Sequence, residues 1–146
     1  MQSLEKLKPL SLLLLRVALG VIFAYHGYPK LFTHSREAMQ GFVRMGFPEY
    51  FAILAGVIEF FGGCMLIAGL FTRLAGLLLA GEMAVALWKV HKLFAAPLAV
   101  DNYQFPLALA AGAFVLATIG PGLISLDQAI FRHGGKKSAR KAKDRD

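Results

Sequence analysis

The sequence has a single cysteine, Cys64, among 146 residues. One thiol excludes an internal disulfide and a Cys-X-X-Cys redox pair, so any sulfur chemistry would need a partner or a cofactor. Cys64 lies inside an apolar stretch, where we expect a small buried hydrophobic side chain rather than a reactive thiol. The chain also lacks a glycine-rich phosphate loop, a dinucleotide fingerprint, a Ser-His-Asp arrangement and a His-Glu-X-X-His motif. These absences argue against a self-contained enzyme of the soluble type.

Charge is scarce and apolar residues are abundant. Hydrophobic residues make up 57% of the chain, charged residues 17%, and the mean hydropathy is +0.57. A membrane-spanning helix needs about 20 apolar residues, and four windows approach that length: 10–26, 50–70, 73–90 and 105–125. The sequence therefore predicts an all-α membrane protein in which residues 1–130 form one domain, a four-helix transmembrane bundle.

Two alternatives to this fold follow from the same windows. The first and third windows are short and charged, which also suits a soluble helical bundle. An N-terminal signal peptide is the other alternative, because Lys6 and Lys8 precede an apolar run. Arg16 interrupts that run, however, and residues 18–20 make only a weak cleavage site.

The formal charge of +7 is concentrated at the C-terminus, where residues 131–146 contain seven Lys or Arg and two Asp. This composition predicts a disordered basic tail. Nucleic-acid binding is one use of such a tail, but behind a membrane span it is typical of a topology signal that contacts anionic lipid. Adding Lys6, Lys8 and Arg73 puts ten cations on the face of the termini, against five on the other face. We therefore predict a membrane protein with several spans and both termini in the cytoplasm.

The first outer loop, residues 33–49, has a helical pattern of its own. Four apolar residues alternate with four polar ones at near-helical spacing: Met39, Phe42, Val43 and Phe47 with Arg36, Glu37, Gln40 and Arg44. This pattern predicts a short interfacial or re-entrant helix, ended by residues 46–48. At the far end of the chain, residues 120–122 should break or kink the fourth helix.

Three charged residues lie inside the apolar windows: Arg16, Glu59 and Glu82. A charge near the bilayer centre costs at least ~2.5–3.5 kcal/mol, so we expect these three side chains to face one another in a polar core. Two carboxylates beside one guanidinium leave a net negative charge, and one glutamate would then hold a proton. That arrangement indicates proton-linked or quinone-linked catalysis, and the alternative is structural pairing that specifies which helices pack together.

The helical spacing places the charges beside small residues. Arg16, Gly20, Phe23, Gly27 and Lys30 fall on one stripe of the first helix. The second helix has a similar stripe of Gly56, Glu59 and Gly63, and the third has one of Gly76, Leu79, Glu82 and Ala86. Glycines on such stripes let a neighbouring helix approach closely.

A second polar cluster is expected at the outer mouth, where His26, Lys30 and His91 would form a cofactor-binding pocket. Two histidines at similar depth could ligate haem, bind a metal or pass protons to a quinone. No third ligand for zinc is apparent, so no metal site is predicted. The residues do not identify a cofactor: a quinone is compatible with them, and haem is disfavoured. An interfacial histidine bonded to backbone or lipid is the alternative.

Four sequence stretches, in order, resemble a known family: residues 15–32, 56–63, 69–83 and 120–127. Together they are similar to the DoxX family of small bacterial and archaeal membrane proteins. The resemblance implies a four-helix inner-membrane protein. It also implies a redox role, since some members are described as the membrane subunit of a thiosulfate:quinone oxidoreductase. Others are described as part of a membrane complex that handles thiol and oxidative stress.

We therefore predict the membrane subunit of a quinone-linked or thiol-linked redox system. Its expected partners are the lipid bilayer, a redox subunit and a second copy of the chain, with no nucleic acid. A proton-coupled transporter of a small solute, working as an oligomer, is one alternative. A structural anchor without chemistry is the other.

Overall fold

The structure is a computed structural model that describes residues 5–90 and 100–131. Every regular element in those residues is a helix, as predicted. The elements in chain order are α2 (Lys8–Tyr28), η1 (Pro29–Thr33), α3 (Ser35–Arg44), α4 (Tyr50–Ala68), α5 (Thr72–Val85), η2 (Ala86–Val90), η3 (Val100–Asn102) and α6 (Gln104–Ile119). Most of the tail 131–146 and His91, both named above, lie outside the described residues.

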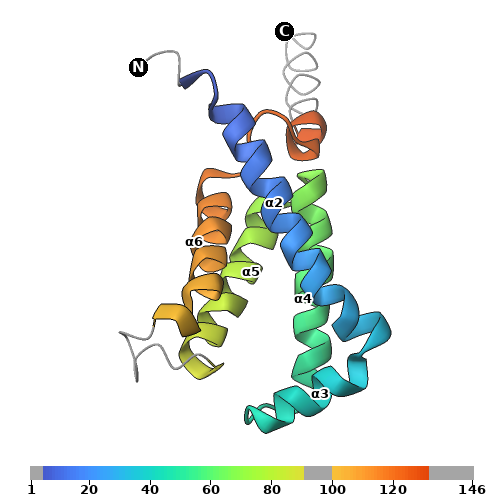
Figure 1. The fold of residues 1–146 in the computed structure, drawn as a ribbon. Coiled ribbons are helices and arrows are strands. Elements are labelled where there is room, and N and C mark those ends of the chain that lie inside the picture. The colour runs from blue at the N-terminus through green and yellow to red at the C-terminus, as the bar shows by residue number, and fades with distance from the viewer. Residues whose placement is uncertain (1–4, 91–99, 132–146) are drawn as a thin grey trace, which may run out of the picture.

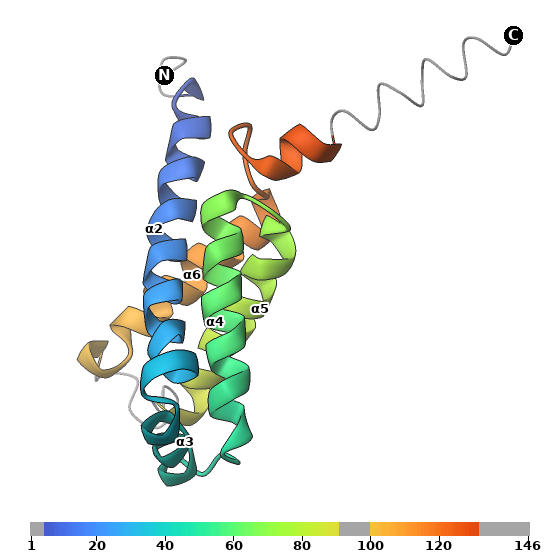
Figure 2. The ribbon, with the colours of Figure 1, turned by 90° about the vertical axis from the view of Figure 1, so that its right-hand side faces the viewer.

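The helices form two pairs that run along a common direction (Figures 1 and 2). The most extensive packing joins α2 to α4 and α5 to α6. The amphipathic helix α3 crosses beneath α2 and α4 at one end, which we call the α3 end (Figure 1). The start of α2, the α4–α5 turn and residues 120–131 lie at the opposite end, which we call the terminal end.

Glycine contacts set how closely α2 and α4 approach. A Cβ atom built on Gly20 would lie 2.7 Å from the carbonyl oxygen of Gly63, and one on Gly27 would lie 2.8 Å from that of Gly56. The two backbones are therefore in direct contact at two levels, seven residues apart on each helix. In a membrane, where lipid is as apolar as the side chains, this close packing is what holds two helices together.

The apolar core lies between the four long helices. Its largest fully buried apolar members are Phe23, Leu66, Leu79 and Leu116, one from each helix. The buried residues of α2 are Arg16, Leu19, Gly20, Phe23 and Gly27, which confirms the predicted stripe. Cys64 is exposed, contrary to the expectation of a buried side chain. The reason is that its neighbour Gly63 faces α2, which turns Cys64 outward.

Two of the four predicted windows yield helices of spanning length. Lys8–Thr33 covers 26 residues with a mean hydropathy of 1.8, and Tyr50–Ala68 covers 19 with 2.2. The other two are shorter: α5 has 14 residues followed directly by the five of η2, and α6 has 16. α6 ends at Ile119 and is followed by Gly120, where φ is +96°, so the predicted break occurs and the helix stops before residue 125. The helix predicted in residues 33–49 is present as α3.

The glycine contacts predict a sharp difference between two alanine substitutions. Gly63→Ala puts a methyl group 2.6 Å from the carbonyl oxygen of Gly20, and a backbone atom cannot move aside cheaply. We expect a loss of ~1–3 kcal/mol in unfolding free energy, measured by denaturation in mixed detergent micelles. Gly81→Ala is the control, because nothing lies within 4 Å of its Cβ. It should be neutral or stabilising by up to ~1 kcal/mol, and equal losses in both variants would contradict the packing.

Candidate functional site

An ion pair between Lys30 and Glu59 lies toward the α3 end of the α2–α4 contact. The Lys30 ammonium donates a hydrogen bond to Glu59 Oε2, and the two side chains are 24% and 5% exposed. The pair depends on the glycine contact, because a Cβ on Gly56 would lie 2.9 Å from Lys30 Cβ. A larger residue at position 56 would push Lys30 away from its partner.

Lys30 belongs to the π-helical turn η1, which continues α2. Pro29 begins this turn and has no N–H to donate, so the regular α-helical hydrogen bonding cannot continue through it. Single π-turns of this kind occur frequently at functional sites. The Lys30 ammonium also lies 5.9 Å from the centre of the Phe42 ring, a cation–π distance that ties α3 to the pair.

Glu82 of α5 is the third charged member of the site. Its Oε2 atom is buried and has no hydrogen-bond partner within residues 5–90 and 100–131. Glu82 lines the same cavity as Lys30 and Glu59. The site thus contains one ammonium and two carboxyl groups, and an unpaired buried oxygen of this kind is costly unless it is protonated or bound to something.

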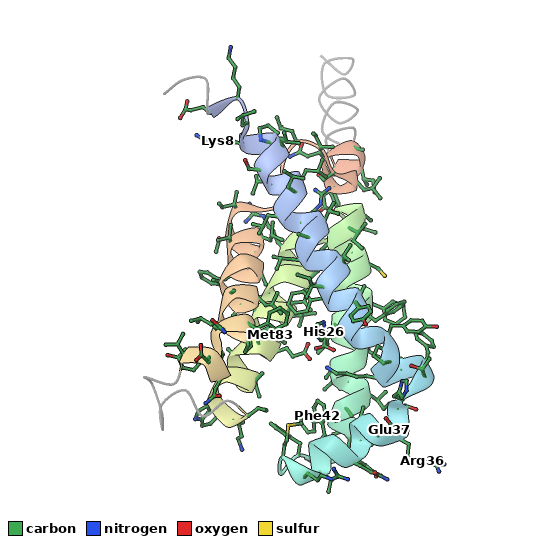
Figure 3. All side chains as sticks on the ribbon, in the orientation of Figure 1. Lys8, His26, Arg36, Glu37, Phe42 and Met83 are labelled. Carbon is green, nitrogen blue, oxygen red and sulfur yellow. The ribbon has the colours of Figure 1, made fainter. Side chains whose placement is uncertain are left out.

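These three residues supply the charged lining of a cavity of about 260 Å³, which we call the slot. The rest of the slot is almost entirely apolar, with Phe42, Met45 and Phe47 on the side of α3. Figure 3 shows Phe42 on the side of α3 nearer the bundle, and Arg36 and Glu37 on its outer side. Apolar walls with a few convergent polar groups are typical of sites for small amphipathic molecules.

Glu59 also lines a second cavity of about 260 Å³, which we call the His26 cavity. The other polar residues of this cavity are His26, Asp101 and Asn102. His26 Nδ1 lies 2.9 Å from the Ile22 carbonyl oxygen and donates a hydrogen bond there, so Nε2 is the ring nitrogen with no hydrogen-bond partner among the described residues. Figure 3 shows His26 near Met83, about half-way along the helices, and His26 is exposed. Glu59 therefore stands between two cavities of similar size.

Arg16 does not take part in this site, and the expectation that it pairs with Glu59 and Glu82 is wrong. Its Nη1 and Nη2 atoms donate to the carbonyl oxygens of Pro121 and Ile124 at 2.6 and 2.8 Å. Lys30, which lies 14 residues further along the same stripe, pairs with Glu59 instead. That separation is ~21 Å along a helix, too far for Arg16 to reach the glutamates.

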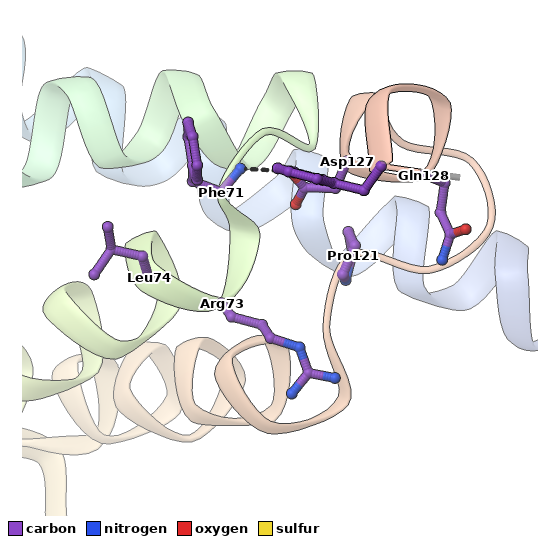
Figure 4. A pocket seen from close by; sticks show the side chains of 7 residues that line it. Phe71, Arg73, Leu74, Pro121, Asp127 and Gln128 are labelled. Carbon is purple, nitrogen blue, oxygen red and sulfur yellow. Dashed lines mark hydrogen bonds between the residues drawn. The ribbon is translucent and has the colours of Figure 1, made fainter. Parts of the chain in front are cut away.

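Arg16 belongs to a polar junction at the terminal end. Both carboxylate oxygens of Asp127 accept hydrogen bonds from backbone N–H groups at the start of α5, from Phe71 at 2.7 Å and Thr72 at 3.0 Å (Figure 4). Arg73 donates to the Thr118 carbonyl oxygen at the end of α6, at 2.9 Å. The junction caps two helix ends and holds residues 120–127 against them, so its role is structural.

The structure thus places two of the three residues predicted to bind a cofactor, His26 and Lys30, on opposite sides of Glu59. The third, His91, lies outside the described residues. Sequence reasoning missed Asp101 and Asn102, and it placed Phe42 and Phe47 in a helix without assigning them to a cavity. Within the described part of the chain, no group of three or more His, Cys, Asp or Glu could hold a metal ion.

Comparison with known proteins identifies a family and relatives that match most of the chain. A family model described as DoxX matches residues 11–92. "Putative oxidoreductase CatD" of Bacillus subtilis is 35% identical over 86% of this chain and 90% of its own. An uncharacterised protein of Haemophilus influenzae is 32% identical over 90% and 99%, and the inner membrane protein YqjF of Escherichia coli is 28% identical over 87% and 97%. No solved structure matches the chain significantly.

Proposed function

Because this chain belongs to the DoxX family and is a membrane protein, we propose that it is the membrane subunit of a redox system that serves a lipid-soluble quinone. The observation that supports this function most is the slot, an apolar cavity with Lys30, Glu59 and Glu82 as its charged lining. A quinone has an apolar tail and a polar ring, so it matches the apolar walls and the charged residues of the slot. The Bacillus subtilis relative, which has a similar length, supports a redox role because its name describes it as an oxidoreductase.

The charged residues match what quinone chemistry needs. Reduction of a quinone to a quinol takes up two electrons and two protons. In this proposal a redox partner subunit supplies the electrons, and no described residue carries them. Lys30 would donate a hydrogen bond to a ring carbonyl, while the carboxyl groups of Glu59 and Glu82 would hold and deliver protons.

The arrangement in the membrane is part of the same proposal. We propose four spans, formed by α2, α4, α5 with η2, and α6, with both termini in the cytoplasm and α3 in the outer interface. The distribution of Lys and Arg supports this orientation. The side chains of α3 support its place, since apolar ones line the slot and charged ones face outward.

Reporter fusions give a direct test of this topology. A fusion within the loop at Ser35 should read external, and one after Phe131 should read cytoplasmic. The proposal places an odd number of spans between Ser35 and Phe131, so these two residues should lie on opposite sides of the membrane. It places an even number between the N-terminus and Phe131, so these two should lie on the same side. If the two fusions report the same side of the membrane, the four-span arrangement is wrong.

The redox proposal predicts that the protein binds quinone and that turnover depends on a carboxyl group that can take up and release a proton. Protein purified in a mild detergent should release quinone on solvent extraction, close to one molecule per chain. Glu59→Gln keeps the shape and still accepts a bond from Lys30, but it cannot titrate. We expect the variant to fold and to lose at least ~10-fold in quinone-dependent turnover, measured in native membranes at equal protein level.

Glu37→Gln is the matched control, because Glu37 is exposed on the outer side of α3. It should leave turnover unchanged. Wild-type turnover in Glu59→Gln would show that Glu59 only pairs with Lys30. An extract of active protein that contains no quinone would contradict quinone as the ligand.

A second function has one observation in its favour. Glu59 lines the slot on one side and the His26 cavity on the other. A carboxyl group between two cavities is also what a proton-coupled transporter of a small solute needs, and such a protein would work as an oligomer. Proton-linked solute uptake by purified protein in liposomes, with no quinone in the extract, would favour transport over redox chemistry.

A further inference from the structure

A groove with no part in the redox proposal lies at the terminal end. It has a volume of about 540 Å³, and its apolar walls are Phe71, Leu74, Pro121 and Phe131 (Figure 4). Arg73, Asp127 and Gln128 are the polar residues of the lining. The groove is bounded by the start of α5 on one side and by residues 121–131 on the other.

Arg73 is a cation on an apolar exterior. Its neighbours in the sequence include three exposed apolar side chains, Phe71, Leu74 and Leu77, and the last residue of α6, Ile119, is a fourth. Arg73 uses two of the five N–H donors of a guanidinium, one to the carbonyl oxygen of Thr118 and one, at 3.3 Å, to that of Ile119. The other three have no partner among the residues that the structure describes. In the proposed topology Arg73 lies at the cytoplasmic face, where anionic lipid headgroups are within reach of a basic side chain.

Asp127 does not neutralise Arg73. Both of its carboxylate oxygens accept hydrogen bonds from backbone N–H groups at the start of α5. Asp127 forms no ion pair with Arg73 among the described residues. Of Arg16, Arg73 and Asp127, the two arginines and one aspartate leave one positive charge over, and that charge is on Arg73 beside the groove.

We propose that this groove binds a phospholipid with an anionic headgroup. The phosphate would accept hydrogen bonds from the free donors of Arg73, and an acyl chain would lie along Phe71, Leu74 and Phe131. Guanidinium groups bind phosphate through paired, charge-assisted hydrogen bonds. The chain after Phe131 contains seven Lys or Arg and two Asp, which draws anionic lipid to the same end. This site is separate from the slot and does not depend on the redox activity.

The test is a lipid titration of the full-length protein in a neutral detergent. Dioleoyl phosphatidylglycerol should raise the midpoint of thermal unfolding in a saturable way, and dioleoyl phosphatidylcholine should not. Gln128→Glu adds a negative charge to the groove without touching Arg73 or its carbonyl partners. We expect the apparent affinity for phosphatidylglycerol to fall ~10-fold, the effect of losing about one charge-assisted hydrogen bond.

Gln40→Glu makes the same change on α3, at the other end of the molecule, and should leave the affinity unchanged. Equal weakening in both glutamate variants would overturn the groove as the site, since surface charge alone would then explain binding. Equal shifts with both lipids would overturn anionic recognition. Inorganic phosphate at the same concentration should have no effect, and a shift as large as that with phosphatidylglycerol would overturn the role of the acyl chain.

Discussion

Lys30 and Glu59 bring opposite charges into a part of the molecule where most side chains are apolar. Their ion pair is held where the backbones of α2 and α4 touch, and it determines what surrounds it. On one side of Glu59 is the slot, with Glu82 and the aromatic side chains next to α3. On the other side is the His26 cavity. Moving either helix by one residue would separate the pair and leave a buried carboxylate without a counter-ion, which is costly.

The two ends of the bundle use their charged residues differently. At the terminal end, Arg16, Arg73 and Asp127 bond to backbone carbonyl and N–H groups, so their hydrogen bonds close helix ends and fix a turn. Toward the α3 end, Glu82 keeps a buried oxygen without a partner among the described residues, beside an ion pair and two cavities. Arg16 also keeps one buried donor, Nε, without a partner among the described residues, so satisfaction alone does not separate the two ends. What separates them is their surroundings: Glu59 and Glu82 line a cavity together, whereas Arg16 is bonded to the backbone of a turn. Unsatisfied charges beside a cavity tend to occur where a protein binds or reacts, which is why we assign chemistry to Glu59 and Glu82 and structure to Arg16.

The sequence was a good guide to the elements and to the faces they bury. Spacing alone identified the stripe of α2, the short helix α3 and the break at Gly120, because these features depend on neighbours within one or two helical turns. The pairing of the charges was predicted less well. Arg16 was assigned to Glu59 and Glu82 because all three lie in apolar windows, but the helix register pairs Lys30 with Glu59, and Glu82 has no ion-pair partner among the described residues.

The partners of Arg16 could not be read from spacing. They are backbone carbonyl oxygens of Pro121 and Ile124, more than 100 residues away in the sequence. Any residue type can supply a carbonyl oxygen, so no side-chain pattern marks them. The sequence did contain one signal, the helix break at Gly120, since a helix that stops leaves carbonyl groups that need donors.

The account rests most directly on the energetic coupling between Lys30 and Glu59, which a double-mutant cycle measures. The variants are Lys30→Met, Glu59→Gln and their combination, with unfolding free energies determined in mixed micelles. If the two side chains form a buried pair, the combined loss should be smaller than the sum of the single losses by ~1–3 kcal/mol. Lys30→Met should be the worse single change, because it leaves the more deeply buried charge alone. Additive losses would show that Lys30 and Glu59 do not interact, and would contradict the placement of the site.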